Sequence, residues 1–255
     1  MVFINSLQSE WLKTKRSTSF WLAIIGGFFI PLIWLTVFLV KGYTINSYGP
    51  IPGIWVMHYN MMWQNMVSFL LPMGVILSSS LITQLEYKNN TWKQVHTTPQ
   101  SYATVFFAKL SAILILTLQF FLYFNIGILL SAYIPTLLLE GGLPNQPLPV
   151  WSIVKSNARI FVTILPIIGI QYLISLRFKN FLVPVGIGLL ALVGTLIAAG
   201  LWEYTWISPY AYCLLNVITP AQANVPINFY WMSVLYFVVL TGINYYLYST
   251  RSEKG

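Results

Sequence analysis

The stretch SFWLAIIGGFFIPLIWLTVFLV, residues 19–40, is 22 residues long and contains no charged side chain. A helix needs about 20 apolar residues to cross the ~30 Å hydrocarbon layer of a membrane. The apolar core of a cleaved signal peptide is shorter, about 7–15 residues, and a small-residue cleavage site follows it. Neither feature is present here, so residues 19–40 predict a membrane-spanning helix that stays in the protein.

Five more apolar runs follow along the chain, at about residues 63–83, 103–133, 160–176, 181–201 and 229–248. The composition agrees with them: 57% of the residues are hydrophobic and 7% are charged, and the mean hydropathy is +0.73. A soluble domain averages about 25% charged residues. The sequence therefore predicts an all-α membrane protein with six transmembrane helices, built as a single permease-sized domain over residues 1–255, and excludes a water-soluble globular enzyme.

The Lys and Arg residues predict the orientation of these six spans. Ten of them fall on the side of the two termini, and only Lys41, Lys155 and Arg159 fall on the other side. Cytoplasmic loops of membrane proteins carry the excess of positive charge, so both termini are predicted to be cytoplasmic. The net charge of +8 is thereby explained without nucleic acid as a partner. We expect Lys155 and Arg159 to anchor the fourth span at the interface, with attraction of an anionic headgroup as the alternative.

Residues 2–16, ahead of the first span, predict an amino-terminal helix that lies in the membrane interface. Phe3, Ile4, Leu7 and Trp11 recur at helical spacing, with polar residues between them. An amphipathic helix of this kind buries its apolar side at the boundary of the headgroups and acyl chains.

Two pairs of small residues, Gly74 with Ser78 and Gly194 with Ala198, have the four-residue spacing that allows helices to approach closely in membranes. The spacing is consistent with close helix contact, but such pairs are common by chance, and we assign them no function. Three uncharged polar residues, Asn65, Gln119 and Asn125, lie within or beside the spans and are candidates for interior polar groups.

The residues that catalysis needs are scarce. The chain has five acidic residues, all Glu, with two His and one Cys, Cys213. The predicted topology puts His58 and His96 on opposite sides of the membrane, which leaves no metal-ligand cluster. No glycine-rich loop ending in Gly-Lys-Ser/Thr is present to hold a nucleotide phosphate. We predict no catalytic, cofactor-binding or metal-binding residue in this chain, and a membrane-embedded enzyme is disfavoured.

The loop at residues 85–99 is the longest one on the predicted cytoplasmic side. Thr91 and Gln94 are spaced as a capping box, so a short helix is expected to begin at Trp92 and to end before Pro99. So short a helix needs a packing partner. Trp92 is either its anchor in a partner's groove or an aromatic residue in the headgroup region. Lys109, inside the third run, is expected to extend its ammonium group to the cytoplasmic face.

Glu86, Asn90, Thr91-Trp92-Lys93-Gln94, Pro99 and Lys109 together resemble the first intracellular loop of ABC-2 type permeases, especially the small permeases of lantibiotic-immunity exporters. The resemblance implies a coupling helix that docks on a separate ATPase. It assigns this docking to Glu86, Tyr87, Thr91, Trp92, Lys93 and Gln94. Residues 202–227, too short to span, are similar to the family's short external helices, and Trp202, Glu203, Trp206 and Tyr210 are candidates for an external gate.

The resemblance also implies a function. The chain would be the permease subunit of an ATP-driven exporter in the bacterial cytoplasmic membrane, with two ATPase subunits that bind ATP and Mg and with a second identical or related permease. Its cargo would be an amphipathic molecule, such as an antimicrobial peptide or a lipid-like substrate. Export of lipids or drugs, a role in cell-surface assembly, and a non-transporting membrane scaffold remain as alternatives.

Overall fold

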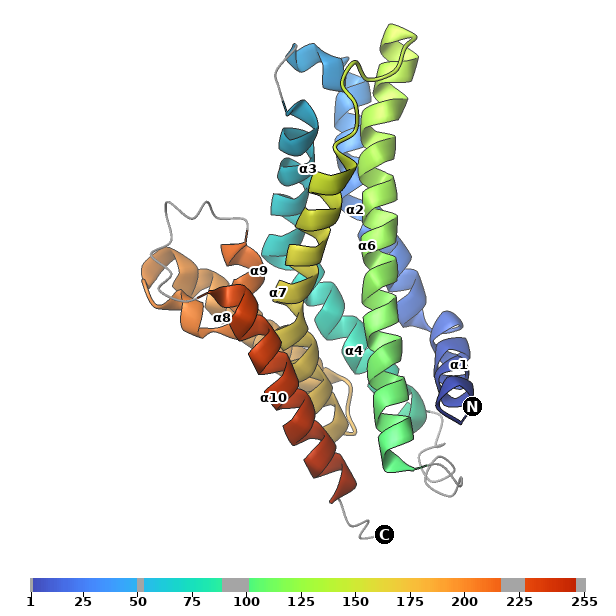
Figure 1. Cartoon of the computed structure of the whole chain (residues 1–255), viewed down its shortest axis with the longest axis vertical. Coiled ribbons are helices and arrows are strands. Elements are labelled where there is room, and N and C mark those ends of the chain that lie inside the picture. The colour runs from blue at the N-terminus through green and yellow to red at the C-terminus, as the bar shows by residue number, and fades with distance from the viewer. Residues whose placement is uncertain (1, 50–52, 89–100, 217–227, 251–255) are drawn as a thin grey trace.

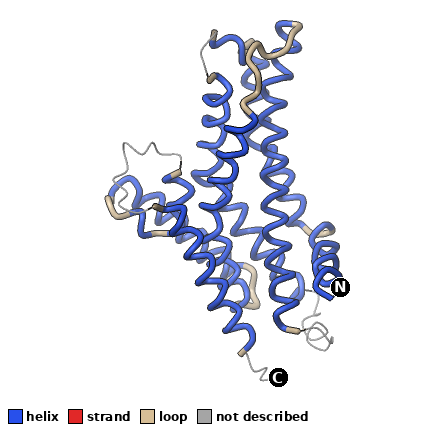
Figure 2. Tube along the Cα trace, in the orientation of Figure 1, coloured by secondary structure: helices blue, strands red, loops and turns tan. Residues whose placement is uncertain are grey.

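The computed structural model describes residues 2–49, 53–88, 101–216 and 228–250, and within these ranges every regular element is helical (Figure 2). Six helical segments are long and apolar enough to cross a membrane. The predicted all-helical fold with six candidate spans is therefore confirmed. The six segments are Thr18–Lys41, Ile54–Leu85, Tyr102–Glu140, Val150–Arg177, Leu182–Leu201 and Phe229–Ser249.

The helices follow one another in a simple order (Figure 1). The first half of the chain contains α1 (Val2–Lys15), α2 (Thr18–Lys41), η1 (Ile45–Tyr48), α3 (Ile54–Asn65), η2 (Met66–Leu70), α4 (Leu71–Lys88) and α6 (Tyr102–Glu140). The second half contains α7 (Val150–Arg177), α8 (Leu182–Leu201), η3 (Thr205–Ile207), η4 (Pro209–Ala211), α9 (Tyr212–Leu215) and α10 (Phe229–Ser249).

Two helix pairs flank a central helix. α2 packs along α6, α7 packs along α10, and α4 lies between them in contact with α2, α6, α7 and α8. α1 and the end of α10 lie at the same end of the bundle, in the lower part of Figure 1. We call this end, with α1, the start of α6 and the α7–α8 turn, the basal end. The opposite end, with η1 and the loop at 141–149, is the distal end.

The α2–α6 pair is packed closely because glycines stand where the helices cross. A Cβ atom on Gly27 would lie 2.9 Å from the Cβ of Tyr123, and one on Gly127 would lie 2.8 Å from the ring of Pro31. Such close approach is typical of membrane helices with small residues at their contact. Gly74 and Gly194, the first residues of the two small-residue pairs, are not at such a contact, since a Cβ on either glycine would have no described atom within 4 Å.

The second span bends where α3 meets α4. The backbone N–H of Leu71 bonds to the carbonyl of Met66, five residues back, so η2 is one π turn. Pro72 follows directly and has no N–H to give to the carbonyl of Ser68, which disfavours regular α-helix here. Helices kink at prolines and π turns, and α4 leaves α3 at an angle in Figure 1.

The helices extend past the predicted apolar runs at the distal end, because polar groups there find partners. Glu140 at the end of α6 accepts hydrogen bonds from the Thr44 hydroxyl and, at 2.6 Å, from the Asn46 amide. The indole N–H of Trp55 donates to the carbonyl of Gln146 at 2.8 Å. The second helix therefore begins at Ile54 rather than near residue 63, and α6 continues beyond residue 133.

Candidate functional site

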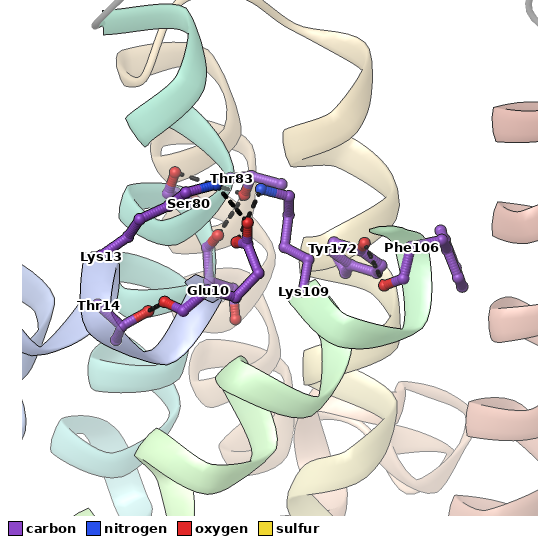
Figure 3. A network of polar contacts seen from close by, with 9 residues as sticks. Glu10, Lys13, Thr14, Ser80, Thr83, Phe106, Lys109 and Tyr172 are labelled. Carbon is purple, nitrogen blue, oxygen red and sulfur yellow. Dashed lines mark hydrogen bonds and ion pairs between the residues drawn. The ribbon is translucent and has the colours of Figure 1, made fainter. Parts of the chain in front are cut away.

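A buried ion pair joins α1 to α6 at the basal end (Figure 3). The ammonium of Lys109 lies 3.2 Å from one carboxylate oxygen of Glu10, and that of Lys13 lies 2.6 Å from the other. The side chains of Glu10 and Lys109 are 7% and 3% exposed, whereas Lys13 is 40% exposed. The sequence predicts that Lys109 extends its ammonium group to the cytoplasmic face. In the structure this group is buried instead and contacts Glu10.

The face of α1 that packs against the bundle is polar. Ser6, Glu10 and Thr14, one turn apart, are its buried residues, and the Thr14 hydroxyl donates to the carbonyl of Glu10 at 2.8 Å. The apolar residues Phe3 and Ile4 remain exposed. A helix is thus present at Val2–Lys15, where one was predicted, and the ion pair connects it to α6, while Leu7 and Trp11 are half-buried. Its position in the membrane interface stays a prediction.

The two ammonium groups of this cluster stabilise the ionised form of the Glu10 carboxyl. Burial by itself raises the pKa of the Glu10 carboxyl, but the ammonium groups of Lys109 and Lys13 outweigh burial, and the net pKa lies below its ordinary value. An opposite charge within a few ångströms favours the ionised form of a carboxyl in this way. Glu10 is therefore ionised at neutral pH, and α1 is attached to α6 by a charged contact.

The first turns of α6 are also held by α7 and α10. The Tyr172 hydroxyl on α7 donates to the carbonyl of Phe106 at 3.0 Å. The Phe106 ring packs against Tyr245 and Tyr248 on α10, with ring centroids 5.6 and 5.7 Å apart. The start of α6, which directly follows residues 89–100, is thus connected to three other helices.

The end of α4, on the other side of residues 89–100, has its own polar contacts. The Gln84 amide donates to the carbonyl of Phe178 in the α7–α8 turn at 2.6 Å. The Gln171 amide donates to Ser80 and to the carbonyl of Pro184, each at 2.8 Å, and Ser80 lies 3.2 Å from Ser175. Both helices that lead into residues 89–100 are therefore fixed to the rest of the bundle by buried polar contacts.

Two of the residues predicted to dock an ATPase lie in a described helix. Glu86 and Tyr87 belong to the last turn of α4, and their side chains are not part of the described structure. Thr91, Trp92, Lys93 and Gln94 lie outside the described residues. Their role stays a prediction.

A second candidate region is the open face of α3, above the π turn. Asn60, Gln64 and Ser68 follow one another at four-residue spacing and are exposed or half-buried, with Met57 and Met61 beside them. This face has an open hollow of about 700 Å³, lined by Gly53, Val56, Met57, Asn60, Met61 and Gln64. The Asn60 and Gln64 amides make no hydrogen bond within the described parts of the chain, so they are available to a ligand or a partner.

The three predicted interior polar groups differ in their surroundings. Asn65 is exposed beside the open face and its amide donates to the carbonyl of Met61 at 2.8 Å, so it is not an interior group. Asn125 is partly buried and exchanges two amide hydrogen bonds, of 2.9 and 3.0 Å, with Asn157. It also accepts from the Tyr59 hydroxyl at 3.0 Å. Gln119 has a buried carbonyl oxygen with no described hydrogen-bond partner.

The predicted gate residues lie in and before a series of short helices between α8 and α10. Trp202 and Glu203 are exposed in the turn after α8, Trp206 is half-buried in η3, and Tyr210 is buried in η4. α9 packs against η2, directly below the open face of α3. Residues 217–227, the rest of the predicted segment, lie outside the described residues, and the gating role stays a prediction.

Two features of the site were missed at the sequence level. The partner of Lys109 is 99 residues away, and no local pattern marks Glu10 as its partner. Asn157 lies in the amino-terminal half of α7, ahead of the predicted span, where its amide gave no reason to expect a link to Asn125. The polar spacing of Asn60, Gln64 and Ser68 was visible in the sequence and could have indicated the open face.

The comparisons with known proteins agree with this architecture. A family model described as "ABC-2 family transporter protein" matches residues 6–198. Searches of curated proteins and of solved structures found no match. The matched range includes Glu10, Lys109 and the open face of α3, and covers about three quarters of the chain. With six apolar helices of spanning length, the chain belongs to the ABC-2 transporter family as a multi-pass membrane permease.

Proposed function

We propose that this chain is one permease half of an ATP-driven exporter, with its termini and the 85–99 segment on the cytoplasmic side of a bacterial inner membrane. Members of the ABC-2 family act with ABC ATPases in general. Two such ATPases would bind ATP and Mg and dock through Glu86, Tyr87, Thr91, Trp92, Lys93 and Gln94. A second identical or related permease would complete the path across the membrane.

The observation that supports this proposal best is the way residues 89–100 are flanked. α4 on one side is bonded to α7 through Ser80 and to the α7–α8 turn through Gln84, and α6 on the other side is bonded to α1 through Lys109. A push on the segment would therefore act on most of the bundle. A loop that served only to join two spans would not require such contacts at both of its ends.

The open face of α3 supports an amphipathic cargo. It combines the Asn60 and Gln64 amides with the flexible, polarisable side chains of Met57 and Met61, and it carries no charged residue. Methionine adapts to ligands of different shape. We propose an antimicrobial peptide as the cargo, removed from the membrane so that the cell is protected. A lipid or a hydrophobic drug would suit the same face.

The ATPase partnership is tested by purifying the tagged chain in mild detergent, identifying its partners by mass spectrometry and measuring vanadate-sensitive ATPase activity. We expect an ABC ATPase to co-purify. Trp92→Ala with Glu86→Ala should lower its recovery and the stimulated activity, whereas Trp21→Ala, at a tryptophan exposed on α2, should not. A chain that purifies alone and stimulates no ATPase would point to a membrane scaffold instead.

The cargo is tested by comparing the minimal inhibitory concentrations of cationic antimicrobial peptides for cells with and without this chain and its ATPase. We expect cells that lack the chain to become more sensitive to at least one peptide. Equal sensitivity to every peptide, with a changed response to hydrophobic drugs, would reject the peptide and favour a drug as the cargo.

A further inference from the structure

Two basic residues form an exposed stripe in the amino-terminal half of α7. Lys155 and Arg159 lie one turn apart on α7, and both are exposed. Trp151, one turn earlier, is 78% exposed. We call these three residues the basic stripe.

The charges of the basic stripe have no carboxylate partner in the described ranges 2–49, 53–88, 101–216 and 228–250. Lys109 shows the opposite arrangement, since its ammonium contacts Glu10. Glu140, at the distal end, is engaged by Thr44 and Asn46. The two cations are therefore available to an anion from outside the chain.

The packing of α7 on α10 shows how deep the stripe lies. The two helices run in the same direction, with Gly169 beside Leu240 and the Asn244 amide 3.1 Å from the carbonyl of Gly169. Arg159 on α7 and Tyr230 on α10 each lie ten residues before this contact. The two residues are therefore at the same level of the bundle. The apolar run of α7 begins at residue 160 and that of α10 at residue 229, so both helices enter the apolar layer here. The stripe thus directly precedes the apolar runs of both helices, which is where lipid phosphates are expected.

Aromatic residues around the stripe agree with this depth. Trp231, at the start of α10, is 74% exposed, and the hydroxyl of Tyr230 donates to Asn216 at 2.7 Å. Tryptophan and tyrosine are enriched at the boundary between hydrocarbon and water. The Tyr230–Asn216 bond also ties the start of α10 to the end of α9, so an occupant of the stripe would lie beside the short helices.

We propose that Lys155 and Arg159 bind the phosphate of an anionic phospholipid in the leaflet opposite the termini. The planar guanidinium of Arg159 matches two phosphate oxygens, and Lys155 adds a second positive charge about 6 Å further along the helix. This binding depends neither on the cargo nor on the ATPase.

The test is native mass spectrometry of the full-length permease with phosphatidylglycerol or phosphatidylcholine of the same acyl chains. We expect preferential retention of phosphatidylglycerol. Removing both cations with Lys155→Gln and Arg159→Gln should weaken that binding about 30-fold, or about fivefold for each charge. Exchanging them, Lys155→Arg with Arg159→Lys, should preserve it, and Lys41→Gln, which removes an exposed cation at the distal end, should leave it unchanged. Melting in phosphatidylcholine checks that each variant is folded.

Equal retention of the two lipids, or unchanged phosphatidylglycerol binding after loss of both cations, would overturn the proposal. Displacement of the lipid by millimolar glycerol phosphate would overturn it as well, because the stripe would then recognise a free phosphate rather than a lipid.

Discussion

Replacing Lys109 with Met should release α1 from α6. The substitution keeps the length of the side chain but removes the ammonium group that lies 3.2 Å from Glu10. Among the described residues, the Glu10 carboxylate, whose side chain is 7% exposed, would then keep Lys13 as its ion-pair partner. Removal of one partner from a buried ion pair costs about 3–5 kcal/mol, because the other charge stays buried without compensation.

The expected cost lies at the lower end of that range, about 3 kcal/mol, because Lys13 still contacts the carboxylate. For a chain of this size, 1 kcal/mol lowers the melting temperature by about 2–4 °C, so we expect a decrease of about 6–12 °C. Lys13→Met is the matched control. It removes an ammonium from the same carboxylate, but Lys13 is 40% exposed, and exposed ion pairs contribute about 1 kcal/mol or less.

The assay is thermal melting of the purified protein in detergent, combined with a double-mutant cycle of Lys109→Met and Glu10→Gln. We expect a coupling energy of about 2 kcal/mol between the two sites. The exchange of charges, Glu10→Lys with Lys109→Glu, should restore at least half of the lost stability. It cannot restore all of it, because the new lysine at position 10 would repel Lys13 one turn away.

The reasoning would be refuted if Lys109→Met melted like Lys13→Met, or if the coupling energy were below about 0.5 kcal/mol. In a complex with an ATPase, Lys109→Met should also reduce the stimulation of ATP hydrolysis, because the start of α6 would lose its connection to α1. Lost stability with unchanged stimulation would keep the ion pair as a structural contact and remove it from the coupling path.

Three further predictions concern other contacts of the bundle. Gly127→Ala would place a Cβ 2.8 Å from Pro31 and should destabilise the protein by about 1–3 kcal/mol, whereas Gly194→Ala, with no described atom near its Cβ, should be neutral or slightly stabilising in the same melting assay. Asn157→Leu removes both amide bonds to Asn125 and should cost about 1–3 kcal/mol, and Asn125→Leu added to it should cost less than the sum of the single changes. Because the pKa of Glu10 is lowered in the folded protein, its contribution is complete above about pH 4.5 and is lost as the pH falls through the folded value. The melting temperature should therefore decrease more steeply below about pH 4.5 in the natural protein than in Glu10→Gln.

The number of spans could be predicted from the sequence, whereas their lengths could not. An apolar run such as residues 63–83 shows which residues suit hydrocarbon, and each of the six runs lies in a helix of spanning length. The helix ends depend on distant partners. Glu140 lies beyond the third run, and the partners that hold it, Thr44 and Asn46, precede it by more than 90 residues.

The candidate site, like the helix ends, could be predicted from the sequence only in part. The polar spacing of Asn60 and Gln64 and the isolated charge of Lys109 are visible in the sequence, but their surroundings are not. Asn65 looked like an interior group and is exposed, because the helix face on which it lies is uncovered in this chain. Gly194 looked like a contact residue and has open space around it, while Gly27 and Gly127 form the close contact. Helix pairing, which periodicity does not determine, decides between these outcomes.

The distribution of contacts also indicates where the permease can move. α2 and α6 meet at glycines that leave no room for a side chain, and α7 meets α10 at Gly169, so each pair is expected to move as one body. Between the pairs, α4 contacts α7 through hydroxyl and amide groups, and these hydrogen bonds can exchange partners with little change in volume. The π turn above α4 provides a place to bend. A push on residues 89–100 acts on the ends of α4 and α6, and we therefore expect ATP-driven movement to appear as sliding of the two pairs along α4, with the open face of α3 changing shape above it.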